Sequence, residues 1–304
     1  MKNIYTAEYV SQGHPDKMCD RISDKVLEAF VEQDKDSRVA VETMGGHGKV
    51  YIMGEVTSTG SLNDSDYKEI VSSVTGSGNY DVRVNIVQQS PEIARGVDAG
   101  GAGDQGIVIG YACNENEEMI PHEYYLAKSL CNHIYKKYPY DGKTQITINS
   151  DFDVLVIVSS FQNVSPEALK SIVEEWIEEN RVSVSSDTKY YLNHLGEWNI
   201  GGFDADTGLT GRKIVVDSYG PRVPVGGGAF SGKDWTKVDR SGAKYAQHIA
   251  RSILKERGAQ EVKVELAYAL GVAEAVQAVV YVDGVSEGLV GFGMEDVEVF
   301  LKKK

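Results

Sequence analysis

The sequence predicts an α+β fold of three related units in a pseudo-threefold arrangement, each a mostly antiparallel sheet with helices on one face. Strong helix patterns recur at roughly one-third intervals along the 304 residues. Strand patterns mostly arrive in neighbouring pairs, which favours antiparallel sheets over a doubly wound parallel sheet. We therefore expect units at residues 1–108, 109–205 and 206–304, with exchange of strands between units left open.

Four segments carry the apolar periodicity of amphipathic helices. They begin at Pro15, Pro121, Ser165 and about Asp239. In the first, Met18, Ile22 and Val26 recur every four residues and form one apolar stripe. Proline in the first helical turn lacks only an N–H that would have no partner there, so Pro15 and Pro121 are good helix starts.

Strands are predicted at 39–43, 50–56, 81–88, 107–109, 145–149, 154–161, 213–217, 261–268 and 276–282. The first two flank a glycine-rich turn and indicate a hairpin. Glu42 and Glu55 lie on its two strands. If they face each other, a bound cation or the ammonium group of a substrate would relieve their repulsion. The spacing alone equally allows the two side chains to lie on opposite faces.

The charge and composition of the chain favour some classes of partner and location over others. The formal net charge is −14, which disfavours partnership with nucleic acid or a membrane surface. Between Asp206 and Lys244, however, seven Lys/Arg outnumber four Asp/Glu, which suits either a small anionic ligand or a solvated basic face. Three scattered cysteines, no apolar leader and no long apolar run predict a reducing, cytoplasmic location.

Two glycine patterns imitate nucleotide-binding motifs. Gly101 to Gly106 matches G-x-G-x-x-G, but an apolar strand follows where a dinucleotide site needs a helix. Gly227 to Asp234 nearly matches a phosphate loop, but Asp234 stands where that loop needs Ser or Thr. Both identities are therefore rejected, although the glycine N–H groups and Lys233 remain able to hold phosphate.

The segment Gly13-His14-Pro15-Asp16-Lys17 lies at a predicted helix N-terminus. Free N–H groups and the helix dipole favour anions there. Together, His14, Asp16 and Lys17 suggest a Mg²⁺–phosphate site with a carboxylate ligand. Considered alone, Asp16 would be a carboxylate that compensates the helix dipole. Considered alone, His14 would be a helix cap or a surface residue.

Taken together, these segments resemble S-adenosylmethionine synthetase (methionine adenosyltransferase), here in a short form. The resemblance is carried by long, ordered runs over most of the chain. They are residues 11–17, 89–91, 101–106, 208–213, 226–234, 237–241 and 271–274.

The resemblance implies that ATP and L-methionine form S-adenosylmethionine, after which the triphosphate is hydrolysed. It implies two Mg²⁺ and one K⁺ per site, and a homodimer with active sites at the subunit interface, with a higher oligomer left open. The implied phosphate contacts, which would also be catalytic, are His14, Arg212, Lys213 and Lys233. The implied metal ligands are Asp16 and Asp239 for Mg²⁺ and Glu42 for K⁺.

The remaining implied contacts hold the two organic groups. Glu55, Gln89, Asp206 and Lys237 match methionine contacts, and Asp104, Trp198 and Asp206 match contacts near the adenosyl group of ATP.

The chain departs from the family pattern in four places. The loop from Gln89 to Gly106 is short, Glu197 replaces an arginine, and the chain ends soon after Gly293. No Asp-Gly-Lys hairpin follows the strand that begins at Gln145, and we expect the loss of one phosphate-binding lysine to slow cleavage of the triphosphate.

Two other function classes compete with this interpretation. One is an ATP-dependent kinase or ligase using the glycine loop, which would form no sulfonium product. The other is a nucleotide-binding protein without catalysis, which should lack an intact cation set. His14, Asp16, Lys233, Lys237 and Asp239 are all present in this chain.

Overall fold

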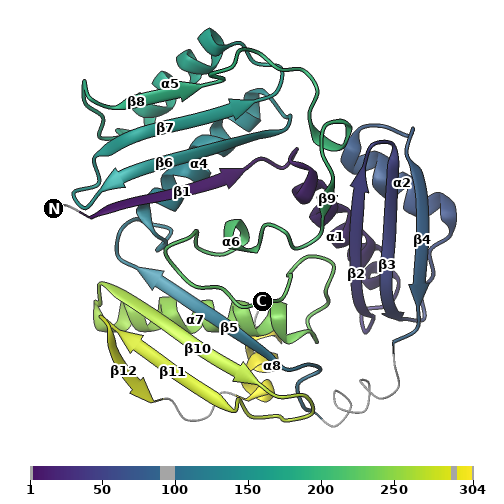
Figure 1. Cartoon of the computed structure of the whole chain (residues 1–304). Coiled ribbons are helices and arrows are strands. Elements are labelled where there is room, and N and C mark those ends of the chain that lie inside the picture. The colour runs from purple at the N-terminus through teal and green to yellow at the C-terminus, as the bar shows by residue number, and fades with distance from the viewer. Residues whose placement is uncertain (1–2, 90–99, 289–292, 303–304) are drawn as a thin grey trace.

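The computed structural model describes residues 3–89, 100–288 and 293–302, and these fold around three four-stranded sheets (Figure 1). The strands are β1 (Ile4–Val10), β2 (Arg38–Gly46), β3 (Lys49–Thr57), β4 (Asp81–Val87), β5 (Gly106–Cys113), β6 (Gly142–Asn149), β7 (Val154–Phe161), β8 (Lys189–Leu192), β9 (Gly208–Leu209), β10 (Glu261–Tyr268), β11 (Gln277–Val282) and β12 (Val285–Gly288). The helices are α1 (Pro15–Gln33), α2 (Asp64–Thr75), α4 (His122–Lys137), α5 (Pro166–Asn180), η1 (Gly202–Asp204), α6 (Ile214–Asp217), α7 (Val238–Arg257) and α8 (Met294–Lys302).

Each sheet takes in one strand from a distant part of the chain. The strand orders are β1-β6-β7-β8, β12-β11-β10-β5 and β4-β3-β2-β9. The pairs β3–β4 and β7–β8 are parallel, and the other described pairs are antiparallel. The predicted α+β architecture of three related units is confirmed. The boundaries after residues 108 and 205 stay a prediction.

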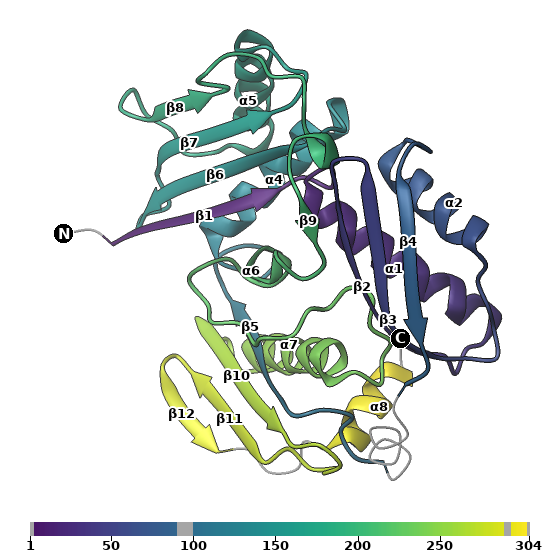
Figure 2. The ribbon, with the colours of Figure 1, turned by 45° about the vertical axis from the view of Figure 1, so that its right-hand side comes forward.

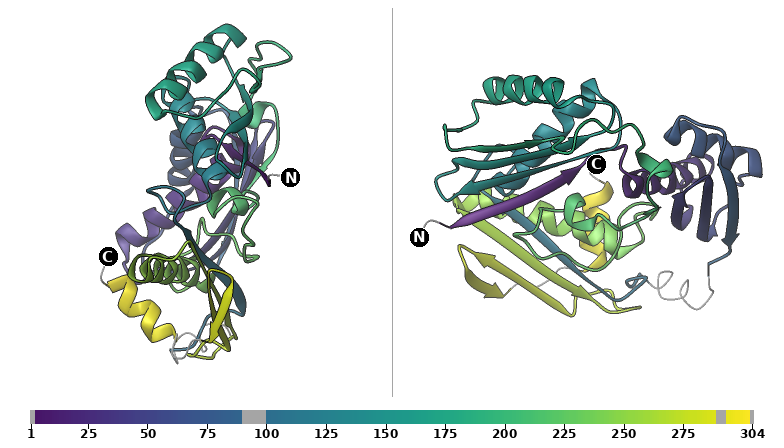
Figure 3. Two further views of the ribbon diagram at one scale, coloured as in Figure 1. Left: turned by 90° about the vertical axis from the view of Figure 1, so that its left-hand side faces the viewer. Right: turned by 45° about the horizontal axis from the view of Figure 1, so that its top comes forward.

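The long helices lie on one side of the molecule and the sheets on the other, as the edge-on view of Figure 3 shows. The helices α1, α4 and α7 pack on β2, on β1 and β6, and on β5 and β10, respectively. Three separate buried clusters fill these interfaces. None of the helices in the described parts of the chain has the length and apolar character that crossing a membrane needs.

Local signals explain where the helices begin. The His14 imidazole accepts a hydrogen bond from the Asp16 N–H and so caps α1, with Pro15 in the first turn. Ser165 caps α5 through the Ala168 N–H. Pro121 is the N-cap residue of α4 rather than part of its first turn, a shift of one position from the prediction.

The predicted strand at 213–217 is wrong, because this segment forms the short helix α6. One helical turn brings residues four apart to the same side. The Lys213 ammonium thereby contacts Asp16, while the Asp217 carboxylate lies 2.6 Å from the Lys17 ammonium. Charge pairing with the start of α1 overrides the strand preference of Ile214, Val215 and Val216.

The outer faces of two sheets carry exposed apolar side chains. Met44 on β2, Met53 on β3, Val87 on β4 and Ile107 on β5 are each about half exposed or more. Figure 2 shows these sheets converging on the central region that holds α6 and β9. Apolar patches of this kind are typical of surfaces that a partner covers.

Close helix–sheet packing at Gly110 gives a testable consequence for the fold. A Cβ at Gly110 would lie 2.0 Å from the Ala246 carbonyl oxygen, so α7 must move to admit any side chain. We expect Gly110→Ala to lower the free energy of unfolding by about 1 to 3 kcal/mol in chemical denaturation. The control is Gly78→Ala, where a Cβ meets nothing within 4 Å; equal effects of the two variants would contradict this packing.

Candidate active site

His14 is held as a neutral imidazole at the start of α1. Its Nδ1 atom accepts a hydrogen bond from the Asp16 N–H at 3.1 Å. Burial, followed by the positive charge of Lys213, lowers the pKa of His14 from 6.5 to about 4. Because a neutral imidazole that accepts at Nδ1 carries its proton on Nε2, His14 can donate one hydrogen bond from Nε2 to an anionic ligand.

The Asp16 carboxylate is fully buried and surrounded by donors. One oxygen accepts the Leu209 N–H at 2.9 Å, and the other contacts the Lys213 ammonium. The Arg212 Nε atom lies 3.4 Å from the first oxygen. Burial alone would raise the pKa of Asp16, but these hydrogen bonds and charges outweigh it and hold the pKa below its ordinary value.

A segment between β9 and α6 fastens this group to α1. Gly211 N–H donates to Asp20, and the Thr210 hydroxyl pairs with Ser23. One face of α1 carries Asp16, Asp20 and Ser23 at successive turns. A single extended segment can therefore form hydrogen bonds with all three. Gly208 fits because it has no side chain: a Cβ there would lie 2.1 Å from the Pro15 carbonyl oxygen.

Lys143 is a positively charged group that the sequence analysis missed. It stands in Asp141-Gly142-Lys143 at the start of β6, two residues before Gln145, whereas the sequence analysis looked for this motif after the strand that begins at Gln145. Its charge is close enough to contribute to the lowered pKa of His14. A lysine therefore does lie near His14, and the expectation of slow triphosphate cleavage, which assumed that this lysine was missing, loses its basis. The three consecutive residues Asp141-Gly142-Lys143 were the sequence signal that could have identified this lysine.

A second group forms where the glycine loop meets the first hairpin. The loop runs beside β2, with Val41 N–H donating to the Gly232 carbonyl and Asp234 N–H to the Val39 carbonyl. Lys233 thereby reaches Asp239, with its ammonium 2.7 Å from the carboxylate. Gly228 is required beside it, because a Cβ there would lie 2.0 Å from the Asp239 carboxyl carbon.

Glu42 and Glu55 belong to this second group. In the hairpin register Glu42 faces Met53 and Glu55 faces Ala40, so both glutamates lie on the outer face of the sheet. The alternative of opposite faces is wrong. Burial of its carboxyl group raises the pKa of Glu42, with Lys233 opposing and Glu55 adding to this shift. A cation near Glu42 would relieve that repulsion.

The residues expected around methionine and adenosine are less closely gathered. Gln89 is buried, and its Oε1 atom has no hydrogen-bond partner among the described residues. The Lys237 ammonium lies 3.2 Å from Asp234. Asp206 is exposed, with its charge close to His14. The Trp198 indole N–H donates to Asn193, and Asp104 is exposed, two residues before β5 begins. Residues 90–91 of the matching run lie outside the described residues.

Most of the predicted residues thus form two groups in one chain, and the remaining ones, Gln89, Asp104, Trp198 and Lys237, belong to neither group. Group A contains His14, Asp16, Asp206, Arg212 and Lys213, with Lys143 added. Group B contains Glu42, Glu55, Lys233 and Asp239. Within residues 3–89, 100–288 and 293–302, no hydrogen bond or ion pair joins the two groups.

Two cavities bordered by described residues do not unite the groups either. One of about 440 Å³ borders Arg212 and Lys213 of group A. Another of about 780 Å³ is lined by residues that include Trp235 and Met294 but no member of either group. Glu42 and Glu55 of group B lie on the outer face of their sheet, whereas His14 and Asp16 of group A are buried.

The neutral state of His14 predicts how stability depends on pH. Between about pH 6.5 and 4 the unfolded chain binds a proton at this histidine while the folded chain does not, so folding loses stability as pH falls through this window. In the wild type this loss amounts to roughly 3 kcal/mol at most. In His14→Asn it should be absent when the free energies of unfolding at pH 7 and pH 4.5 are compared by chemical denaturation. The same substitution at exposed His194 is the control; an unchanged pH dependence in His14→Asn would contradict a buried neutral imidazole.

The chain matches one enzyme family along almost its whole length. Residues 2–98, 99–198 and 200–295 match the N-terminal, central and C-terminal domains of S-adenosylmethionine synthetase. S-adenosylmethionine synthase 2 of Rhodospirillum rubrum is 37% identical over 93% of this chain and 81% of the relative. S-adenosylmethionine synthase of Prochlorococcus marinus is 41% identical over 91% of this chain and 80% of the relative.

Structural similarity agrees with the sequence matches. A solved structure described as an unusual S-adenosylmethionine synthetase from Campylobacter jejuni superposes with a TM-score of 0.83 at 34% identity. The match covers 99% of this chain and 85% of that one. This chain therefore belongs to the S-adenosylmethionine synthetase family.

Proposed function

We propose that this chain makes S-adenosylmethionine from ATP and L-methionine at sites formed between group A of one subunit and group B of a second. The observation that carries the proposal is the division of site residues into two charged groups that no hydrogen bond or ion pair joins among the described residues. Apolar side chains such as Met44 and Met53 lie on the same outer face as Glu42 and Glu55. A two-fold dimer would bury those side chains and create two equivalent sites.

The reaction needs alignment and charge stabilisation more than a nucleophilic side chain. The sulfur of methionine attacks the 5′ carbon of ATP, forms a sulfonium and releases triphosphate. Holding both reactants in line removes much of the entropic barrier. We assign the triphosphate to His14, Lys143, Arg212 and Lys213 from one subunit and Lys233 from the other, since fixed donors and cations stabilise a charged leaving group.

We assign the binding of methionine and of the adenosyl group to the remaining site residues. Glu55, Gln89 and Lys237 would hold the amino and carboxylate groups of methionine, and the unpartnered Gln89 Oε1 is suited to an ammonium donor. Asp206 lies close to His14 and would approach both substrates. Trp198 and Asp104 are assigned to the adenosyl group.

The carboxylates of Asp16 and Asp239 suit Mg²⁺, which is commonly held by one or two carboxylates together with substrate phosphates. When bound, Mg²⁺ would neutralise charge that develops on the triphosphate. Glu42, on the sheet face beside Glu55, is the assigned K⁺ ligand.

The two Mg²⁺ carboxylates are already paired with the cations assigned to phosphate. Lys213 contacts Asp16 and Lys233 contacts Asp239. Each lysine thus neutralises a carboxylate that would otherwise carry an uncompensated charge. Binding of the magnesium–ATP complex would exchange these partners, with each lysine turning to phosphate as its carboxylate receives Mg²⁺.

Catalysis should depend on a divalent cation and on both carboxylates. Incubation with ATP and isotopically labelled methionine should give labelled S-adenosylmethionine, measured by mass spectrometry, and excess chelator should abolish it. Asp16→Asn and Asp239→Asn should each lower turnover by about a hundredfold or more, because each removes a charged ligand. Full activity in chelator would contradict the metal assignment, and a methionine adduct lacking a sulfonium would favour a ligase.

A further inference from the structure

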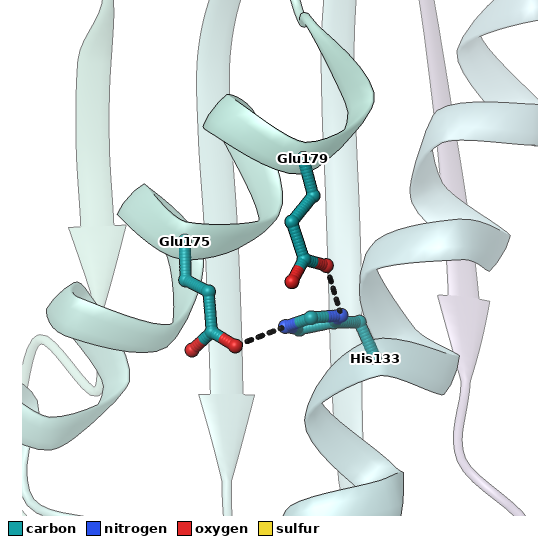
Figure 4. Close-up of side chains that lie close together, drawn as sticks. All are labelled: His133, Glu175 and Glu179. Atoms are coloured by element: carbon teal, nitrogen blue, oxygen red, sulfur yellow. Dashed lines mark ion pairs between the residues drawn. The ribbon is translucent and has the colours of Figure 1, made fainter.

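A cluster of possible metal ligands lies outside the proposed active site, between α4 and α5 (Figure 4). It consists of His133 on α4 and of Glu175 and Glu179 on α5. Each residue can offer one ligand atom such that all three atoms lie within 4.8 Å of one another. Because α4 and α5 lie on the helical side of the molecule, the cluster is separated from the outer sheet faces.

Helix geometry places the three side chains together. Glu175 and Glu179 are four residues apart, so they project from the same face of α5. The fully buried Trp176 fixes α5 against α4, with its indole N–H donating to Ser129 at 3.0 Å. Ser129 lies one turn before His133, so this contact holds the imidazole opposite the two glutamates.

Each nitrogen of the His133 imidazole has a glutamate carboxylate nearby, but at a distance longer than a hydrogen bond. Its Nδ1 atom lies 3.7 Å from Glu179 and its Nε2 atom lies 4.0 Å from Glu175. Both distances exceed a normal hydrogen bond. The Nε2 atom is also buried and has no hydrogen-bond partner among the described residues, an arrangement that costs free energy unless a ligand satisfies it.

We propose that His133, Glu175 and Glu179 bind one divalent transition-metal ion of the Zn²⁺ class. Ligand atoms bound to one zinc ion at about 2.0 to 2.2 Å lie roughly 3 to 4 Å apart, so the longest separation here must shorten. The two glutamate side chains, 44% and 57% exposed, can rotate to do so. One imidazole with two carboxylates suits Zn²⁺ or Co²⁺ better than Mg²⁺, which prefers oxygen ligands.

Lys137 modulates this site. It lies one turn beyond His133 on α4, and its ammonium contacts the Glu175 carboxylate. In the free protein this contact offsets part of the negative charge, and it competes with an incoming cation for Glu175. Removing the ammonium should therefore tighten metal binding.

The test uses the intact, metal-free protein. Co²⁺ is titrated while its visible absorption is recorded, and the unfolding temperature is measured with and without Zn²⁺. The wild type should bind one ion that gives the spectrum of a nitrogen-coordinated site, and Zn²⁺ should raise its unfolding temperature through preferential binding to the folded state. His133→Ala and Glu179→Gln should weaken binding by about tenfold or more, and Lys137→Ala should strengthen it.

Matched variants separate this site from other carboxylates. Glu178→Gln changes the exposed neighbour of Glu179, and His194→Ala changes an exposed histidine elsewhere; both should bind Co²⁺ like the wild type. Because Glu179 is exposed, Glu179→Gln should fold normally. Equal binding by the wild type and Glu179→Gln would place the ion elsewhere, and absence of binding would leave a histidine–glutamate ion pair only. Either result overturns the proposal.

Discussion

The buried carboxylate of Asp16 is the interaction on which the rest of the site depends. An ionised carboxylate inside a protein needs charged and hydrogen-bonding partners, and removing one partner typically costs 3 to 5 kcal/mol. Here the partners come from about 195 residues further along the chain, at Leu209, Arg212 and Lys213. Satisfying this one charge therefore fastens the segment between β9 and α6 onto α1 and positions the cations of group A.

The same constraint explains why local and global preferences disagree at one segment. Residues 213–217 contain three consecutive β-branched side chains, which favour a strand. A strand would point Lys213 and Asp217 to the same face about 13 Å apart, too far for the adjacent residues Asp16 and Lys17 to pair with both. A single helical turn shortens that separation, and two ion pairs form instead. Sequence periodicity contains no information about these partners.

Much else followed from the sequence. The starts at Pro15 and Ser165, the first hairpin and the predicted long helices are confirmed, because caps, turns and apolar stripes are local signals. The placement of β1 in the sheet of β6 is a long-range pairing that no local pattern specifies. Motifs in the sequence identified most residues of group A and group B. They could not predict that the two groups lie apart within one chain. Lys143 was missed through an error about where its motif begins, not through lack of a signal.

Complementation between inactive variants tests most directly whether each active site combines group A of one subunit with group B of another. Asp16→Asn and Asp239→Asn, each inactive alone, are mixed, unfolded and refolded together, and S-adenosylmethionine formation is measured. In a mixed dimer one site receives both substitutions and the other receives neither, so random pairing should restore about a quarter of wild-type activity. Recovery to about that level is the predicted result. If the refolded mixture, shown to contain mixed dimers, stays as inactive as its components, the sites are not shared in this way and the account is contradicted.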